Sequence, residues 1–181
     1  MDERYPIGRF ERTETPPDLA TCAALIDAIE QAPSIMRSLV DHLTEEQLEW
    51  RYRPAGWTIR QVVHHVPDSH MNAYIRMKLA VTQESPTITT YDEARWAELR
   101  DVRSVPVGVS LDLLDMLHRR WVAFLRSLSD SECRRAYIHP ERGPMTIYEG
   151  VAMYAWHGRH HAAHISNALR RSNAPKGTRI H

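Results

Sequence analysis

Eleven of the 181 residues are histidines, and most of these gather in two stretches of the chain. The first stretch holds His64, His65 and His70, and the second holds His157, His160, His161 and His164. The ring nitrogens of histidine bind zinc, nickel, copper and iron. The two stretches therefore predict a metal site that is assembled from distant parts of the sequence.

The second stretch offers two pairs of histidines at the spacing of one helical turn. His160 and His164 are four residues apart, so their side chains project from one face of a helix. His157 and His161 form another such pair on the neighbouring face. Spacing alone does not choose between the pairs, although the helical wheel places His157 and His161 nearer the apolar stripe that contains Val151.

A third ligand is expected from the first stretch, where His64 and His65 are the candidates. The polar residues that share a helical face with His65 are Asp68, Ser69, Asn72 and Arg76. Such a stripe on a bundle helix is explained if it faces an internal site. Three histidines leave one tetrahedral position open, as in catalytic zinc sites. A fourth ligand, such as His64 or His157, would instead indicate a structural metal in a non-enzymatic protein.

The elements that must position these residues are predicted to be helices. Apolar residues recur at helical spacing over residues 18–40, 58–81, 110–128 and 146–171, which predicts four long helices. Shorter helices are predicted at 44–50 and 91–102, and a loop at 138–145. Because no segment alternates like a strand, the predicted fold class is all-α, a four-helix bundle.

Side chains that can cap a helix mark the predicted starts. These residues are Thr15, Thr44, Thr58, Ser110 and Thr146. Pro33 falls inside the first long segment, where it is expected to kink or interrupt the helix.

The length of the chain favours one domain, residues 1–181, in which residues 1–16 form an extended arm. Lysine plus arginine and aspartate plus glutamate both total 23, so nothing favours nucleic acid or an anionic membrane as a partner. A near-neutral chain is prone to self-association, which favours a dimer. With two cysteines and no secretory signal or membrane segment in the sequence, a cytoplasmic location is expected.

Several separated blocks of the sequence closely resemble the YfiT-like branch of the DinB superfamily. They are Tyr5–Gly8, Gly56–Asn72, Tyr91–Glu93 with Trp96, Leu117–Trp121 and Tyr154–Ile165. Together they spread the resemblance over nearly the whole chain.

The resemblance implies a four-helix bundle with a three-histidine metal site. One ligand comes from the second long helix and a pair from the fourth, which in this chain carries over to His65, His160 and His164. The cofactor implied is one divalent metal per chain, zinc or nickel. The resemblance thus favours the pair 160/164 over the pair 157/161.

The activity implied is that of a metal-dependent hydrolase, in which the metal activates water, in a homodimer that acts on a small molecule. The alternative is a thiol S-transferase that conjugates a low-molecular-weight thiol such as bacillithiol to electrophiles. In both cases the metal serves as a Lewis acid at its open position.

Three polar residues beside His65 are candidates for roles in the reaction, and none is assigned as catalytic. Asp68 could orient a ligand imidazole or accept a proton, or pair with an arginine at the surface. Asn72 and Arg76 could bind a substrate carboxylate, because arginine offers a planar fork of donors, or could form a solvated face.

The sequence departs from the resemblance at Pro67, where a residue such as alanine is expected. Proline removes a backbone donor and crowds the carbonyl of Val63, so a bend is predicted beside His65.

Overall fold

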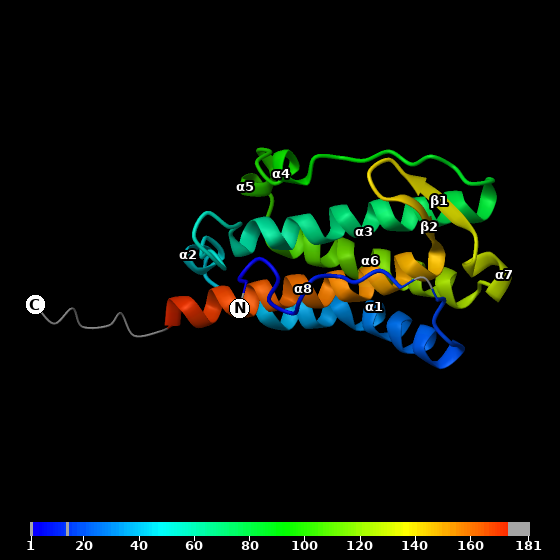
Figure 1. Ribbon diagram of the computed structural model, residues 1–181. Coiled ribbons are helices and arrows are strands. Elements are labelled where there is room, and N and C mark those ends of the chain that lie inside the picture. The colour runs from blue at the N-terminus through cyan, green and yellow to red at the C-terminus, as the bar shows by residue number, and fades with distance from the viewer. Residues whose placement is uncertain (1, 14, 174–181) are drawn as a thin grey trace, which may run out of the picture.

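The computed structural model describes residues 2–13 and 15–173. Four long helices form a bundle (Figure 1): α1 (Leu19–Val40), α3 (Ile59–Thr82), α6 (Val107–Arg126) and α8 (Ile147–Asn173). Short helices connect them: α2 (Glu45–Leu48), α4 (Glu93–Trp96), α5 (Asp101–Ser104) and α7 (Asp130–Cys133). The predicted all-α four-helix bundle is therefore confirmed. None of the helices in the described part of the chain is long and apolar enough to cross a membrane.

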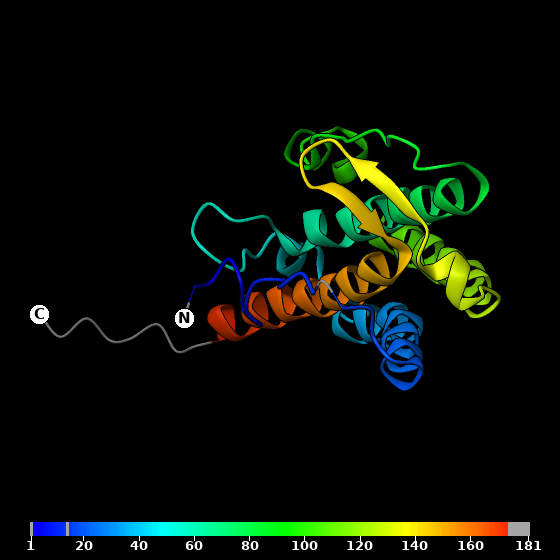
Figure 2. The same cartoon turned by 45° about the vertical axis from the view of Figure 1, so that its right-hand side comes forward.

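The order of the long helices around the bundle differs from their order along the chain. Helix α1 packs on α6 and α8, and α3 packs on the same two helices. The consecutive long helices α1 and α3 therefore lie diagonally opposite each other (Figure 2). Helices α3 and α8 run in opposite directions (Figure 1), which brings the first histidine stretch beside the second.

The segment predicted as a loop at 138–145 is instead part of a β-hairpin. Strands β1 (Ala136–His139) and β2 (Gly143–Thr146) pair in antiparallel fashion, with Tyr137 opposite Met145. Both of these side chains are buried against the bundle. The strands are too short for an alternating pattern to be visible in the sequence, and burial on the bundle stabilises a hairpin that would be marginal alone.

Three of the predicted caps are confirmed. The side-chain oxygens of Thr44 and Thr58 each accept a hydrogen bond from the backbone N–H three residues later, within complete capping boxes. Thr146 makes the same exchange with Glu149 at the start of α8. The prediction of Thr15 as a cap was wrong, because Asp18 caps α1 and accepts from the N–H of Thr21.

Ser110 was also wrongly predicted as a cap. Helix α6 begins at Val107, directly after Pro106, whose fixed φ suits a helix start. The Ser110 hydroxyl is buried and lies 2.7 Å from His64 Nδ1. The single helix predicted at 91–102 is divided into α4 and α5.

The two prolines inside long segments do not end their helices. Helix α1 continues through Pro33, and α3 continues through Pro67, so the predicted interruption at Pro33 is absent. Both prolines are buried in the bundle. We infer that tertiary packing on both sides offsets the cost of the lost backbone hydrogen bond.

Replacing Thr58 with alanine is expected to lower the free energy of unfolding by about 1 kcal/mol, because α3 loses the acceptor of its first turn. Urea unfolding followed by circular dichroism measures the change. Thr82→Ala, near the exposed end of α3, is the control and should change the free energy by less than about 0.5 kcal/mol. Equal effects of the two substitutions would contradict the capping role.

The interior of the bundle is divided by a layer of histidines. One apolar cluster surrounds Trp121 and Met77 at the hairpin end, and the other surrounds Leu48 and Ile165 at the opposite end. His70 on α3, His118 on α6 and the buried histidines of α8 fall between the segments that build these two clusters, and His64 and His65 lie at the adjoining end of one cluster on α3. Polar groups in such a layer are costly to bury unless they are paired or bind a ligand.

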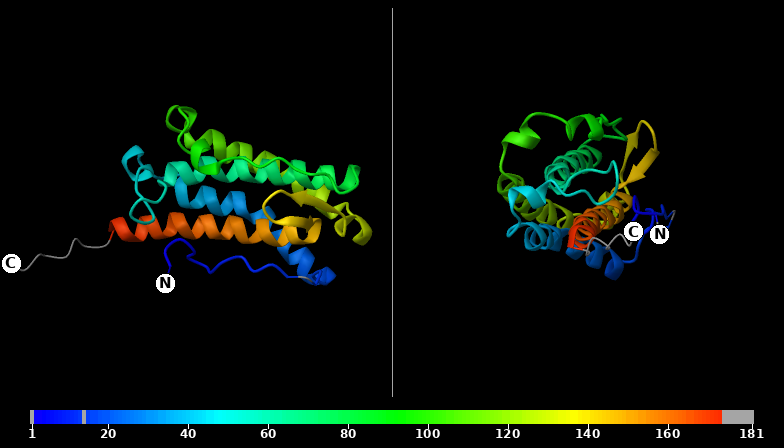
Figure 3. Two further views of the ribbon diagram at one scale, coloured as in Figure 1. Left: turned by 45° about the horizontal axis from the view of Figure 1, so that its top comes forward. Right: turned by 90° about the vertical axis from the view of Figure 1, so that its left-hand side faces the viewer.

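The N-terminal segment, described over residues 2–13, contains no helix and lies along α8 (Figure 3). Arg12 forms an ion pair with Glu149, and the Tyr5 ring lies 6.2 Å from the His160 ring. Phe10 lies 6.0 Å from Trp156, measured between ring centroids. The arm thus covers the face of α8 that carries His160.

Candidate metal centre

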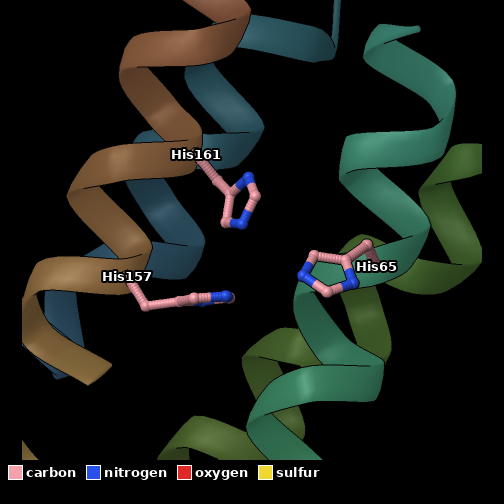
Figure 4. A group of neighbouring side chains, drawn as sticks. All are labelled: His65, His157 and His161. Carbon is pink, nitrogen blue, oxygen red and sulfur yellow. The ribbon is translucent and has the colours of Figure 1, made fainter. Parts of the chain in front are cut away.

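Three histidines from two helices converge in the buried layer. His65 comes from α3, and His157 and His161 come from successive turns of α8 (Figure 4). One nitrogen from each ring lies within 4.8 Å of the others. The ring centroid of His65 lies 5.5 Å from that of His157 and 5.0 Å from that of His161. These are separations that one ion between the rings could bridge.

The structure does not bring the predicted trio of His65, His160 and His164 to one point. His160 and His164 form a second group with His161, on α8 alone. The His160 ring stacks on Trp156 at 4.4 Å, and the His164 ring stacks on Tyr52 at 3.8 Å.

The physical reason for this difference is the helical rotation of about 100° per residue. It turns the pair 157/161 towards α3, so that this pair, and not 160/164, lies beside His65. This placement agrees with the position of the pair 157/161 nearer the apolar stripe of α8, because a stripe that faces the core also faces the neighbouring helix.

Two further histidines connect His157 to the opposite side of the bundle. His157 Nδ1 lies 3.0 Å from His70 Nε2, and His70 Nδ1 lies 2.7 Å from His118 Nε2. His118 Nδ1 lies 2.6 Å from the backbone oxygen of Ile29 on α1. Sequence reasoning counted His70 in the first stretch without giving it a role. It gave no role to His118 either, although this histidine lies within the apolar stripe of α6 and within the block Leu117–Trp121 that carries the resemblance.

The donor set fits a divalent metal of the kind that imidazole prefers. Burial, with a smaller contribution from His160, lowers the pKa of His65 to about 4. Burial also lowers the pKa values of His157 and His161 well below 6.5. The three rings are therefore neutral near pH 7, which is the form that binds metals. His161 Nδ1 is buried and has no hydrogen-bond partner among the described residues.

A pocket of about 310 Å³ opens beside the three histidines. Its walls include Trp57, Ser69, Arg76, Tyr91 and Tyr154. All three rings of the candidate site contribute to the lining, so a molecule in the pocket would reach the point between them. The volume is at the lower end of the range for small-molecule sites.

Of the three reaction candidates beside His65, only Arg76 lines this pocket. Asn72 donates a hydrogen bond to the backbone oxygen of Asp68. Burial, with a smaller contribution from Asp101, raises the pKa of Asp68 to about 6. Arg60, one of the arginines that could pair with Asp68 on the helix surface, instead forms ion pairs with Glu45 of α2 and with Glu49, which directly follows α2.

The metal-free protein is expected to lose stability as the pH falls from 7 to 5. Burial lowers the pKa of His118 to about 4, against about 6.5 in the unfolded chain. Between these values the unfolded state binds a proton that the folded state does not. Each such histidine therefore leaves the free energy of unfolding undiminished above pH 6.5. Below pH 6.5 it lowers that free energy by about 1.4 kcal/mol per pH unit.

Urea unfolding in EDTA at pH 7.5, 6.5 and 5.5 measures this dependence. His118→Phe should reduce the decrease between pH 6.5 and 5.5, whereas replacement of the exposed His42 should not. A stability that is flat from pH 7.5 to 5.5 would contradict the neutral, buried state of these rings.

The chain matches proteins whose names refer to metal-dependent hydrolysis. Residues 28–165 match the family model of the DinB superfamily. A protein of Oceanobacillus iheyensis named "Putative metal-dependent hydrolase" is 46% identical over 173 residues, covering 96% of this chain and 99% of the relative. A relative of the same name from Bacillus licheniformis is 48% identical over 167 residues, covering 91% and 94% of the two chains.

Solved structures give the same fold. YfiT from Bacillus subtilis, described as "a probable metal-dependent hydrolase with an unusual four-helix bundle topology", superposes with a TM-score of 0.92 at 41% identity. The match covers 95% of this chain and 98% of that one. A mycothiol-dependent maleylpyruvate isomerase, at 15% identity, covers 80% of this chain and 60% of that chain with a TM-score of 0.65, which shows a shared fold alone.

Proposed function

The chain belongs to the DinB superfamily, and from this premise we propose that it is a metal-dependent hydrolase of a small molecule. His65, His157 and His161 would hold one divalent metal, zinc or nickel. The observation that carries the proposal is the convergence of three neutral imidazoles from α3 and α8 on the wall of a pocket. The names of the relatives support the same class of activity.

The number of ligands supports an enzyme over a purely structural site. No fourth histidine, cysteine, aspartate or glutamate of residues 2–13 and 15–173 joins the group of His65, His157 and His161. Three protein ligands leave a coordination position open towards the pocket. A divalent metal held in this way acts as a Lewis acid and lowers the pKa of a water molecule or thiol at the open position.

The residues around the three ligands hold their rings in place. The Trp57 ring lies 4.8 Å from the His65 ring and covers it on one side. His70 holds Nδ1 of His157, so that the ring edge carrying Nε2 points into the site (Figure 4). Such outer contacts fix the orientation of a ligand ring and commonly change metal affinity by about 10–100-fold.

Thiol S-transfer remains the second candidate, because an open position on the metal would activate a thiol as well as water. The two reactions are separated by a comparison of products. We expect protein that was stripped with a chelator and reloaded with zinc or nickel to bind about one equivalent of metal. We expect the reloaded protein to hydrolyse members of an ester and amide panel without an added thiol.

Elemental analysis measures the metal, and release of the acid product measures hydrolysis. The chelated protein is the control for the metal, and monochlorobimane with a low-molecular-weight thiol is the parallel assay for transfer. Conjugation in the absence of any hydrolysis would replace the hydrolase by the transferase. A protein that binds no metal would contradict both.

A further inference from the structure

Arg76 is a buried cation on the wall of the candidate site. This residue is 8% exposed; its guanidinium donates a hydrogen bond to the backbone oxygen of Thr89, at 2.9 Å, and another to the hydroxyl of Tyr154. Its Nε is buried without a hydrogen-bond partner among the described residues. None of the ion pairs formed in this part of the chain includes Arg76. A buried charge in this state is costly unless a ligand supplies the counter-charge.

The surroundings of Arg76 select an anion as that ligand. The pocket that Arg76 lines also contains the three histidines of the candidate metal site. A second arginine, Arg142, lies at the exposed rim of the pocket and forms no ion pair with a carboxylate of residues 2–13 and 15–173. The carboxylates of Glu93 and Glu141 also line the pocket, but both residues are exposed and solvated. The buried part of the pocket is therefore positive.

We propose that Arg76 binds a carboxylate of the substrate while another part of the substrate reaches the point between the histidines. A guanidinium binds a carboxylate through charge-assisted hydrogen bonds, and Arg76 lines the pocket that a substrate would enter. This inference rests on the proposed function and narrows the substrate class to small molecules that carry a carboxylate besides the reacting group.

The test compares the binding of acetate and glutarate to zinc-loaded protein by titration calorimetry. Arg76 and the three histidines line one pocket, so we expect glutarate, which has two carboxylates, to bind at least about tenfold more tightly than acetate. Arg76→Gln should abolish this preference, and Arg76→Lys should retain part of it. Arg142→Gln is the matched control from the rim of the same pocket and should retain the preference.

Metal content, helix content and glutarate binding by metal-free protein separate this inference from the proposed function. Elemental analysis should find the same metal content in all variants, and circular dichroism should find the same helix content. Equal affinities for the two acids in the wild type, or an unchanged preference in Arg76→Gln, would overturn the carboxylate site while the metal site stands. A wild type that takes up no metal would overturn the proposed function. In that case the carboxylate site would still be supported if metal-free wild type bound glutarate more tightly than metal-free Arg76→Gln does.

The row of histidines behind His157 carries a second, independent inference. The Ile29 oxygen can only accept, so the hydrogen of His118 lies on Nδ1. A neutral imidazole has one N–H, so His118 Nε2 must accept from His70 Nδ1. By the same rule His70 Nε2 accepts from Nδ1–H of His157. Each hydrogen bond thus fixes the direction of the next.

We infer that the Ile29 carbonyl, through His118 and His70, fixes His157 in the tautomer that leaves Nε2 free to bind a metal. His70 and His118 are positioning residues in this scheme, because neither belongs to the group of candidate ligands. Both are almost fully buried, at 0% and 2% exposure, so water does not compete for their hydrogen bonds. Outer contacts of this kind commonly set which nitrogen of a ligand histidine is metallated.

Long-range ¹H–¹⁵N spectra of histidine-labelled, metal-free protein read the tautomers directly. We expect His157 to carry its hydrogen on Nδ1 in the wild type and to show mixed tautomers in His118→Phe. Zinc affinity should decrease by about 10–100-fold in His118→Phe. His118→Gln keeps a donor and an acceptor, so it should restore in part both the His157 tautomer and the zinc affinity.

His64→Phe is the matched control, because His64 is also buried, on α3, but its Nδ1 forms a hydrogen bond with Ser110 instead of with a histidine of the row. It should leave the His157 tautomer unchanged. A wild-type His157 protonated on Nε2, or equal zinc affinities of His118→Phe and His64→Phe, would overturn the inference. The tautomer is measured in metal-free protein, so the inference about His157 can fail or hold independently of the proposed metal-dependent function.

Discussion

Alanine in place of His157 or His161 is expected to abolish metal binding, whereas alanine in place of His164 is expected to preserve it. Only the first two rings share one point with His65, and two remaining imidazoles bind a divalent ion far more weakly than three. His164 instead stacks on Tyr52, and its loss removes no ligand from the group. The expected metal content is therefore about one equivalent in His164→Ala and none in the other two variants.

Elemental analysis after loading and desalting measures this result. His164 is a demanding control, because it lies on the same helix, is also buried, and is four residues from another histidine. Loss of metal from His164→Ala, with metal retained by His157→Ala, would return the ligand set to His65, His160 and His164. Circular dichroism of each variant shows that the helices are intact.

Alanine in place of Trp121 is expected to lower the free energy of unfolding by about 3–5 kcal/mol. Trp121 is 0% exposed, and its indole N–H lies 3.3 Å from the sulfur of Met77. Its ring also packs edge-on against His70 and His118, at 5.7 and 5.6 Å between centroids. The substitution therefore leaves a large cavity beside the histidine row.

Urea unfolding of the metal-free variant gives this number. Trp96→Ala is the matched control, because Trp96 is 40% exposed on the short helix α4, and it should cost much less. A cost below about 1 kcal/mol for Trp121→Ala would show that the bundle collapses around the cavity.

The fold could be predicted from sequence where helical periodicity is long. Each of the four long helices spans at least 20 residues, so the apolar stripe repeats several times and the segment is unmistakable. The hairpin could not be predicted in the same way. Its strands have four residues each, and their stability comes from burial of Tyr137 and Met145 on helices distant in sequence.

The candidate site was predictable in its residue type and helices but not in its pairing. A histidine pair on α8 and one of His64 and His65 on α3 follow from spacing, and the resemblance selects His65. The choice between 157/161 and 160/164 depends on how α8 is rotated about its axis relative to α3, and only packing decides this rotation. The contribution of His118 depends on the diagonal topology, which places α6 next to both α1 and α3.

The convergence of α3 and α8 on one group of ligands also links cofactor uptake to folding. The ligands are distant in sequence, so the unfolded chain does not present them together, and an ion held between the helices favours the folded state by mass action. A free ion concentration one hundred times the dissociation constant would contribute about 2.7 kcal/mol. The heat resistance of this protein would then depend on the supply of metal in its surroundings as well as on its packing.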